Sequence, residues 1–425
     1  MKLISEIDQK TKLSMIKLYF STGSSADPAG KEGLCALTIR ALLWGTESKS
    51  QKELSFAIEK IGASISTGAG IDRSIVVLTV IEEKVDAALE LLQEILLKPK
   101  FDESSISKLK DLMQGEIRAQ MADPRYLSGR AMMAKVMKDS PYASPGEGTL
   151  ESLKNLNVDD VTQFYNRFFG KKGLLIGMVG SERFIERQGA IQAKLSELPD
   201  EEVLSPKGPE LQIKSREGLV IDKAGLSTTP ILLSIPGFLE DDPDRECLEF
   251  ANFIFGGDFT SRLMQVLRAQ NGWTYGVSSG FGQQYGLRDP KSLFSIYTFP
   301  SAQYADLVIP KTVSLFEEFI EKGLTADEFE YAKESVSNGF ALRIDSAHKR
   351  LGWKIRNALV GRRIYSLEEF RKKIMDYHRE QVNELIAKRF QTEQLLITTA
   401  GQAASLSDCI CKVRGFKKVE VFKDV

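Results

Sequence analysis

Hydrophobic residues follow two spacings along the chain, and these spacings predict both strands and helices. Alternation of apolar and polar positions predicts strands over 12–21, 63–70 and 74–81. Apolar residues three and four positions apart predict amphipathic helices over 52–61, 85–97, 102–121 and 130–137. Residues 33–46 differ, because they are apolar almost all round and have a glycine at position 33 and another at 45. This pattern predicts a buried helix.

The second half of the chain repeats the pattern of the first. Val161 matches Val382, Leu174 matches Leu395 and Gly180 matches Gly401, each 221 positions further on. Residues 98–110 parallel residues 321–333 at an offset of 223. A near-constant offset at both ends of each half predicts two tandem copies of one α+β domain. Each copy is expected to form a mostly antiparallel sheet with helices packed on one face.

The boundary between the copies is expected where turn-forming residues cluster. Residues 205–210 read S-P-K-G-P-E, with two prolines and one glycine. We therefore expect an N-terminal domain over 1–204, a linker over 205–216 and a C-terminal domain over 217–425.

Composition and charge exclude several classes of partner. The 425 residues are 42% hydrophobic, and 57 basic residues against 58 acidic ones give a net charge of −1. We therefore expect no nucleic-acid partner and no anionic membrane partner. The sequence contains no apolar run of about 18 residues, so we expect no membrane span. The charged N-terminus does not match a secretory signal, which predicts a cytoplasmic protein as the sequence stands, or a periplasmic one if a signal peptide was trimmed.

Cysteine and histidine offer little metal-binding chemistry. Cys35 and Cys247 lie in apolar helical patterns and are expected in the core. Cys409 and Cys411 form C-x-C, which is too close for an ordinary disulfide and has no histidine beside it. The two histidines, His348 and His378, lie in charged helical segments. We expect no metal and no other cofactor in this chain.

Residues 256–280 carry the richest candidate chemistry. Thr260 or Ser261 is expected to cap a helix that ends at Asn271-Gly272, and a strand is expected from Trp273 onward. Arg268 then lies in the last helical turn and Tyr275 near the start of the strand. Held at that junction, a guanidinium and a phenol could donate hydrogen bonds to a peptide carbonyl and its developing oxyanion. The structural alternative is a cation at a helix terminus and a half-buried strand tyrosine.

Two other motifs are weaker. Residues 276–280 fit G-x-S-x-G, but the glycine-broken segment that follows does not predict the helix that a serine-hydrolase elbow requires. Residues 68–70 lack the third glycine of a dinucleotide fingerprint. These glycines are more simply explained by an uncrowded edge strand with which an extended peptide could pair.

The chain as a whole resembles the pitrilysin/insulinase-type (inverzincin) zinc metallopeptidases. The resemblance rests on D-P-A-G-K-E-G-L before the apolar helix, G-T after it, the edge-strand glycines, the duplication, and an arginine and tyrosine seven residues apart after S-R-L. The family's H-x-x-E-H motif falls on Ala36, Ile39 and Arg40, so the zinc positions are degenerate. In small bacterial members the work is often divided, with zinc in one subunit and the Arg/Tyr pair in the other.

The resemblance implies a clamshell of two domains and a zinc-free, substrate-binding subunit of a heterodimeric metallopeptidase. The homologous partner subunit would bind zinc, and Arg268 and Tyr275 would complete its site in trans on polypeptide substrates. The isolated chain is expected to be inactive alone, and a homodimer of the isolated chain is left open. The alternative is a non-catalytic structural or peptide-binding assembly protein of the same fold.

The charge of Arg40 raises a separate question. A guanidinium in an apolar helix needs a partner or a route to water. The family's third zinc ligand falls near Gly115 or Glu116, so one hypothesis is that Arg40 pairs with Glu116 where zinc would be bound. The alternative is that Arg40 reaches the surface at the helix edge.

Overall fold

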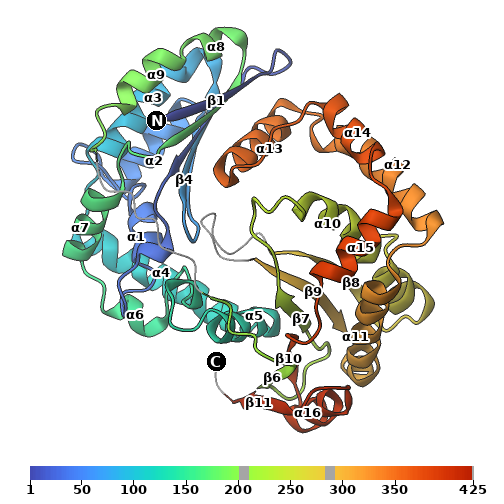
Figure 1. The fold of residues 1–425 in the computed structure, drawn as a ribbon. Helices are drawn as coiled ribbons and strands as arrows, with labels where there is room; N and C mark the ends of the chain where they lie inside the picture. The colour runs from blue at the N-terminus through green and yellow to red at the C-terminus, as the bar shows by residue number, and fades with distance from the viewer. Residues whose placement is uncertain (201–209, 283–291, 424–425) are drawn as a thin grey trace.

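Two mixed but mostly antiparallel sheets, one from each half of the chain, form the framework of the protein (Figure 1). The computed structural model describes residues 1–200, 210–282 and 292–423. The first sheet has the order β1-β5-β2-β4-β3 and contains β1 Lys2–Ile7, β2 Leu13–Phe20, β3 Ser64–Ala69, β4 Ser74–Ile81 and β5 Leu175–Gly180. The second has the order β11-β6-β10-β7-β9-β8 and contains β6 Glu217–Asp222, β7 Ile231–Pro236, β8 Thr274–Phe281, β9 Leu293–Pro300, β10 Leu396–Gly401 and β11 Lys418–Phe422.

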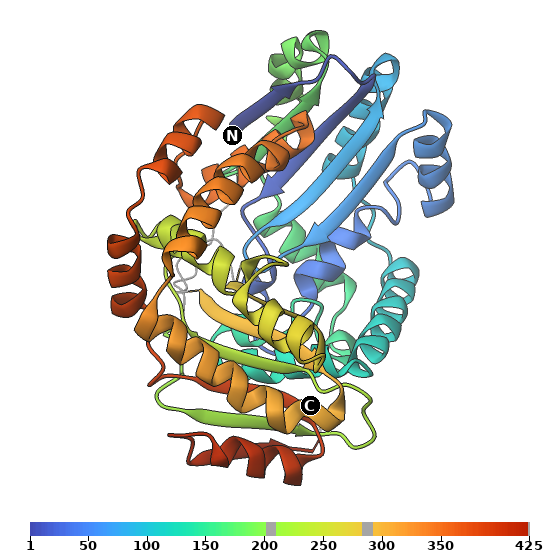
Figure 2. The same cartoon turned by 90° about the vertical axis from the view of Figure 1, so that its right-hand side faces the viewer.

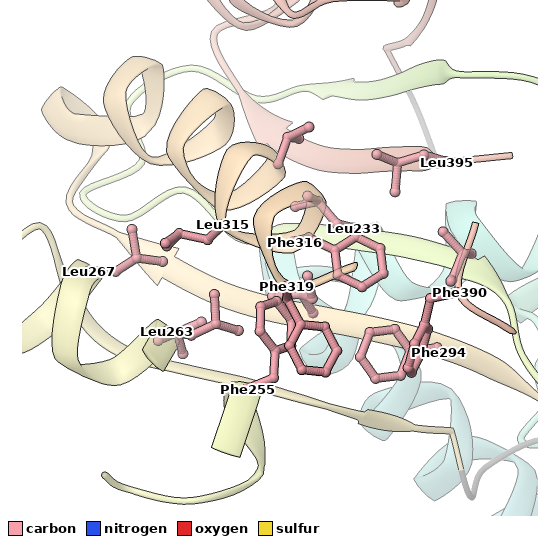
Figure 3. Close-up of a cluster of buried hydrophobic side chains, with 14 of the residues drawn as sticks. Leu233, Phe255, Leu263, Leu267, Phe294, Leu315, Phe316, Phe319, Phe390 and Leu395 are labelled. Carbon is pink, nitrogen blue, oxygen red and sulfur yellow. The ribbon is translucent and has the colours of Figure 1, made fainter. Parts of the chain in front are cut away.

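Helices pack against both sheets and enclose two large cores. The first half contains α1 Leu34–Ala41, α2 Gln51–Lys60, α3 Val85–Leu97, α4 Glu103–Met121, α5 Pro124–Val136, α6 Leu150–Lys154, α7 Val158–Phe168, α8 Glu182–Glu186 and α9 Gln188–Leu195. The second contains α10 Arg245–Asn252, the π-helices η4 Phe253–Gly257 and η5 Met264–Gln270, α11 Ala305–Lys322, α12 Ala326–Arg343, α13 Ala347–Val360, α14 Leu367–Met375, α15 Arg379–Arg389 and α16 Ala403–Lys412. The core of the second half is rich in phenylalanine, and the rings of Phe255 and Phe319 stack with their centroids 4.5 Å apart (Figure 3).

The duplication predicted from the sequence is confirmed by the element bounds. Helices α7 and α15 begin and end 221 positions apart, as do strands β5 and β10. Helices α4 and α12 begin 223 positions apart, and so do α5 and α13. The α+β class and the mostly antiparallel sheets are also confirmed.

One helix of each half packs on the sheet of the other half, a feature that the sequence did not predict. Helix α13 packs on β1 and β5, where Leu351 and Ile355 join the core of the first sheet (Figure 1 and Figure 2). A Cβ at Gly177 would lie 2.4 Å from Ile355, so a side chain there would clash with this packing. Helix α5 packs reciprocally on β6, β7 and β10, and Met132 lies in that contact. The two halves therefore share cores and form one packed body.

Several local predictions need correction. The apolar helix is shorter than 33–46, because α1 ends at Ala41 and the next residues form tighter turns in which Leu43 and Trp44 donate to the carbonyls three residues earlier. The helix predicted over 130–137 is the C-terminal part of α5, which begins at Pro124. Of the predicted linker, residues 205–209 lie outside the described part of the chain, so the domain bounds remain a prediction. No helix in the described ranges is long and apolar enough to span a bilayer.

Candidate functional site

Helix α1 is fixed at its start by a buried carboxylate. Gly33 has φ = +90°, a conformation that favours glycine, and it turns the chain into the helix. The two carboxylate oxygens of Asp27 accept hydrogen bonds from the backbone N–H groups of Gly33 and Cys35, each at 2.8 Å. Burial raises the pKa of Asp27 to about 7, although these N–H groups act in the opposite direction. The start of α1 is therefore coupled to a carboxyl group that titrates near neutral pH.

The three degenerate zinc positions lie on α1 beside helix α4. Ala36 and Ile39 are buried, and Arg40 is the basic residue of the last turn. An Nη of Arg40 donates to Glu116 of α4 at 2.8 Å, which confirms the hypothesis that these two residues pair. Their side chains are 36% and 45% exposed, so Arg40 also reaches solvent. Each of the two hypotheses about Arg40 was therefore partly right.

Zinc does not fit this donor set. A methyl group, a butyl side chain and a guanidinium provide no lone pair to a metal, and the guanidinium places a positive charge beside the one carboxylate that could bind it. Within the ranges that the structure describes, three or more histidine, cysteine, aspartate or glutamate side chains do not cluster as a metal site anywhere.

A cavity of about 630 Å³ opens beside the Arg40–Glu116 pair. One wall is the edge strand β3, from Thr67 to the following Gly70, and another is helix α5, with Arg125 and Arg130. All of the residues that line this cavity lie between Ser24 and Glu147. Its described lining therefore comes from the first half, and neither Arg268 nor Tyr275 is part of that lining.

In the second half, a β-bulge turns Tyr275 outward. The pairing of β8 with β9 shifts between Thr274 and Val277, so Tyr275 lies in an irregularity of an edge strand. The hydroxyls of Thr274 and of the buried Thr298 both donate to the carbonyl of Gly276, at 2.9 and 3.0 Å, and fix the bulge. Bulges of this kind redirect a side chain next to functional sites. The side chain of Tyr275 is 79% exposed.

Arg268 lies against Tyr275, at the junction of helix and strand where the sequence placed both residues. It occupies the last turn of η5, and its guanidinium carbon is 5.5 Å from the centre of the Tyr275 ring. A second ring, Phe259, lies 4.8 Å from the same carbon and is 68% exposed. Among the residues that the structure describes, the side chain of Arg268 has no hydrogen-bond or ion-pair partner. Two aromatic rings contact the guanidinium, and within the described part of the chain its five N–H donors are not used.

Sequence reasoning missed Phe259 and assigned the wrong cap to this segment. Asp258, rather than Thr260 or Ser261, holds the turn before η5, because its carboxylate accepts from both the backbone N–H and the hydroxyl of Thr260, at 3.0 and 2.8 Å. Burial acts to raise the pKa of Asp258, but the hydrogen bonds from Thr260 outweigh it, and the pKa lies below its ordinary value. The D-F-T-S order contains the signal for this turn, since aspartate commonly bonds the backbone two residues on.

The other candidate groups take structural places. The G-x-S-x-G sequence at 276–280 lies within strand β8, which excludes the strand-turn-helix geometry of a hydrolase elbow. Cys35 is fully buried and Cys247 packs against the second core, as predicted. Cys409 is buried and Cys411 is exposed, and all four thiols are free.

These features together define a duplicated α+β metallopeptidase-like protein whose zinc positions carry Ala36, Ile39 and Arg40. Residues 2–150 match the family described as Insulinase (Peptidase family M16), and residues 155–336 match the description Peptidase M16 inactive domain. The chain belongs to this M16 family. The resemblance to insulinase-type peptidases inferred from the sequence is therefore confirmed.

Relatives and solved structures agree with this assignment over most of the chain. The non-peptidase homolog YmxG of Helicobacter pylori is 24% identical over 352 residues, which cover 82% of this chain and 80% of that protein. The uncharacterized zinc protease YmxG of Bacillus subtilis is 21% identical, with 93% and 95% covered. A peptidase M16 inactive domain from Pseudomonas fluorescens has the same fold, with a TM-score of 0.83, 25% identity, and 94% and 95% covered.

Proposed function

We propose that this chain is the zinc-free, substrate-binding subunit of a two-subunit metallopeptidase. In this proposal Arg268 and Tyr275 act in trans at the zinc site of a homologous partner. The observation that carries it is the state of Arg268, a guanidinium in contact with two exposed rings, whose N–H donors have no partner among the described residues. A merely structural arginine would be expected to spend those donors on a carboxylate or carbonyl of its own chain.

The separation of the two halves of the chemistry supports action in trans. The degenerate zinc positions lie at a cavity lined by residues 24–147, and the Arg268–Tyr275 pair lies on the other half of the chain. Within the described ranges of a single copy, no cluster of metal-binding side chains is present for the pair to act with. A partner that carries an intact H-x-x-E-H motif would supply them, and zinc bound there would polarise the peptide carbonyl.

The residues of this chain would bind and orient the substrate. The planar guanidinium of Arg268 can donate two parallel N–H bonds, and the phenol of Tyr275 can donate one O–H bond. Aimed at a peptide carbonyl, these donors stabilise the negative charge that develops on its oxygen during hydrolysis. The two rings hold the cation in place before the substrate arrives, so little ordering remains to be done on binding.

The proposal is tested by mixing this chain with a homologous chain that carries H-x-x-E-H and measuring cleavage of a peptide library. We expect the isolated chain to be inactive and the mixture to be active. Arg268→Ala and Tyr275→Phe should each lower kcat/KM by about a hundredfold or more, the usual cost of removing one oxyanion donor. Arg118→Ala, which alters an exposed arginine of α4 in the other half of the chain, serves as the control for Arg268→Ala.

The competing function is a non-catalytic assembly or peptide-binding protein of the same fold. Full activity of the mixture with both substitutions at Arg268 and Tyr275 would establish that alternative and reject action in trans. Binding of the variants to the partner is measured separately by analytical ultracentrifugation, so that a lost subunit contact is distinguished from lost catalysis.

A further inference from the structure

The cavity of the first half contains more hydrogen-bond donors than the protein itself uses. Arg40 spends one of its five N–H groups, on Glu116. Arg130, which lines the same cavity from α5, also makes one hydrogen bond, to the carbonyl of Ala143 at 3.2 Å. No carboxylate of the described chain lies within ion-pair distance of Arg130. Two cations thus face one cavity with most of their donors free.

The environment of Arg130 indicates that this cation has not been neutralised. Burial lowers the pKa of Arg130, and the nearby Tyr126 and Glu147 only partly oppose that effect. Glu147 is already engaged, because it accepts a 2.6 Å hydrogen bond from the hydroxyl of Tyr126. A half-buried guanidinium without an ion pair among the described residues gains from an external anion.

The balance of charges limits the ligand to a single anionic group. Arg125, the third arginine of the cavity, is already paired with Asp123 at 3.0 Å. That leaves Arg40 and Arg130 facing Glu116 and Glu147. The excess is therefore of donors rather than of positive charge, which disfavours a polyanion such as a nucleic acid and suits one carboxylate.

The remaining wall indicates what carries the carboxylate. Strand β3 is the edge of its sheet and pairs with β4 on one side, so its other side presents backbone N–H and C=O groups without a strand partner among the described elements. Gly68 and Gly70 leave two positions of that wall without a side chain. An edge of this kind binds an extended peptide by adding it as a further strand. The volume of about 630 Å³ is typical of a ligand site.

We propose that this cavity is a second, non-hydrolytic site that binds the C-terminal end of a polypeptide. The peptide lies along β3, and its terminal carboxylate is held by Arg40 and Arg130 at the place where the family's zinc would be bound. This site is independent of Arg268 and Tyr275. Its failure would leave the proposed trans function untouched, and the reverse also holds.

The isolated chain is sufficient for the test, and cleavage is not measured. A fluorescein-labelled hexapeptide of alanine, serine and threonine is titrated by fluorescence anisotropy, once as the free acid and once as the C-terminal amide. The free acid should bind about tenfold tighter or more, the value of a charge-assisted hydrogen bond. Arg40→Gln and Arg130→Gln should remove most of that difference. Glu116→Gln should strengthen binding of the acid, because it frees Arg40 and removes a like charge.

The controls separate this site from general surface attraction. Arg118→Gln alters an exposed arginine of α4 that bonds Gln114 and does not line the cavity, so it should leave both titrations unchanged. Thermal melts establish that each variant is folded, and the exposed position of Arg40 makes Arg40→Gln the safer variant. Equal affinities of acid and amide, or equal losses in Arg40→Gln and Arg118→Gln, would overturn carboxylate capture. If free alanine displaces the labelled peptide at the same concentration as the unlabelled peptide does, the proposed contact with strand β3 is wrong.

Discussion

Arg40 and Arg268 lie on different helices of the two halves, each near an edge strand, and their surroundings are opposite. Each is the basic residue in the last turn of a helix that contacts the edge strand of its sheet, β3 for Arg40 and β8 for Arg268. Arg40 is paired with a carboxylate at 2.8 Å, whereas Arg268 is bounded by two exposed aromatic rings. One cation is partly neutralised, and the other is positioned without being neutralised.

This difference shows two ways in which a fold can hold an arginine at the end of a helix. A carboxylate partner lowers the cost of a cation in an apolar helix, but it competes with any anionic or carbonyl ligand. Aromatic faces orient a guanidinium through its π-face and leave its N–H edge available. The second arrangement is therefore suited to a donor that acts on a substrate, and the first to a site where a ligand must displace or share a partner.

The largest expected effect concerns the carboxylates that hold the two helices. Asp27 at the start of α1 has its pKa raised by burial from 3.8 to about 7, whereas the pKa of Asp258 before η5 is lowered by its hydrogen bonds with Thr260 despite some burial. Between pH 3.8 and about 7, Asp27 keeps its proton in the native state and loses it in the unfolded chain. The protonated carboxyl group of Asp27 therefore contributes stability at low pH, and this contribution is lost as the pH rises. The loss is roughly 4 kcal/mol between pH 4 and pH 8.

Urea unfolding of the wild type and Asp27→Asn at pH 4.5, 6 and 7.5 checks this prediction. The stability of the wild type relative to Asp27→Asn should fall steadily across the series. Asp258→Asn is the matched control. The contribution of the Asp258 carboxylate to stability is lost only as the pH falls below the ordinary range of aspartate. The stability profile of Asp258→Asn should therefore run parallel to that of the wild type between pH 4.5 and 7.5. Parallel profiles for Asp27→Asn as well would show that the carboxyl group is not the coupled one.

The sequence predicted those parts of the site that depend on local pattern. The periodicity and the 221-residue offset predicted the two halves, and the local pattern placed Arg268 at the end of a helix and Tyr275 near the start of a strand. Glu116 was found because the motif fixed its distance from Arg40 to within one residue. These features survive in sequence because they are set by helix and strand geometry over short spans.

The remaining features depend on packing between distant segments. The exchange of α5 and α13 between the sheets brings together residues more than 80 positions apart, and apolar periodicity does not say which sheet an apolar face will cover. Phe259 was missed because an exposed phenylalanine in a turn resembles any other surface residue until Arg268 is seen against it. The turn at Asp258 was misassigned because Thr260 and Ser261 are equally good capping residues by type.

A smaller effect is expected at Phe259, which distinguishes the aromatic arrangement from simple exposure of Arg268. Phe259→Leu removes one of the two rings and should lower kcat/KM of the mixed assembly about fivefold, since a cation–π contact at an exposed site contributes roughly 0.5–1 kcal/mol. Phe259→Tyr keeps a ring and should restore the activity. In the isolated chain, the Nε–Hε resonance of Arg268 should lose the Phe259 part of its ring-current shift in Phe259→Leu and keep it in Phe259→Tyr, while the Tyr275 ring contributes in both. An unchanged resonance in Phe259→Leu would reject the stacking role whatever the activity shows.

The smallest effect is expected at the Arg40–Glu116 pair. A double-mutant cycle measures the coupling energy between these two side chains. Both side chains are at least one-third exposed, so Arg40→Gln, Glu116→Gln and the double variant should give a coupling energy below about 1 kcal/mol that falls further in 1 M NaCl. The matched cycle on Arg262 and Glu328, which are less exposed and form two parallel hydrogen bonds, should give a larger and less salt-sensitive coupling. A coupling energy of several kcal/mol between Arg40 and Glu116 would mean that the pair is a stabilising structural ion pair. The cation would then be committed to Glu116 in the same way that Arg262 is committed to Glu328, and it would not be available to a ligand.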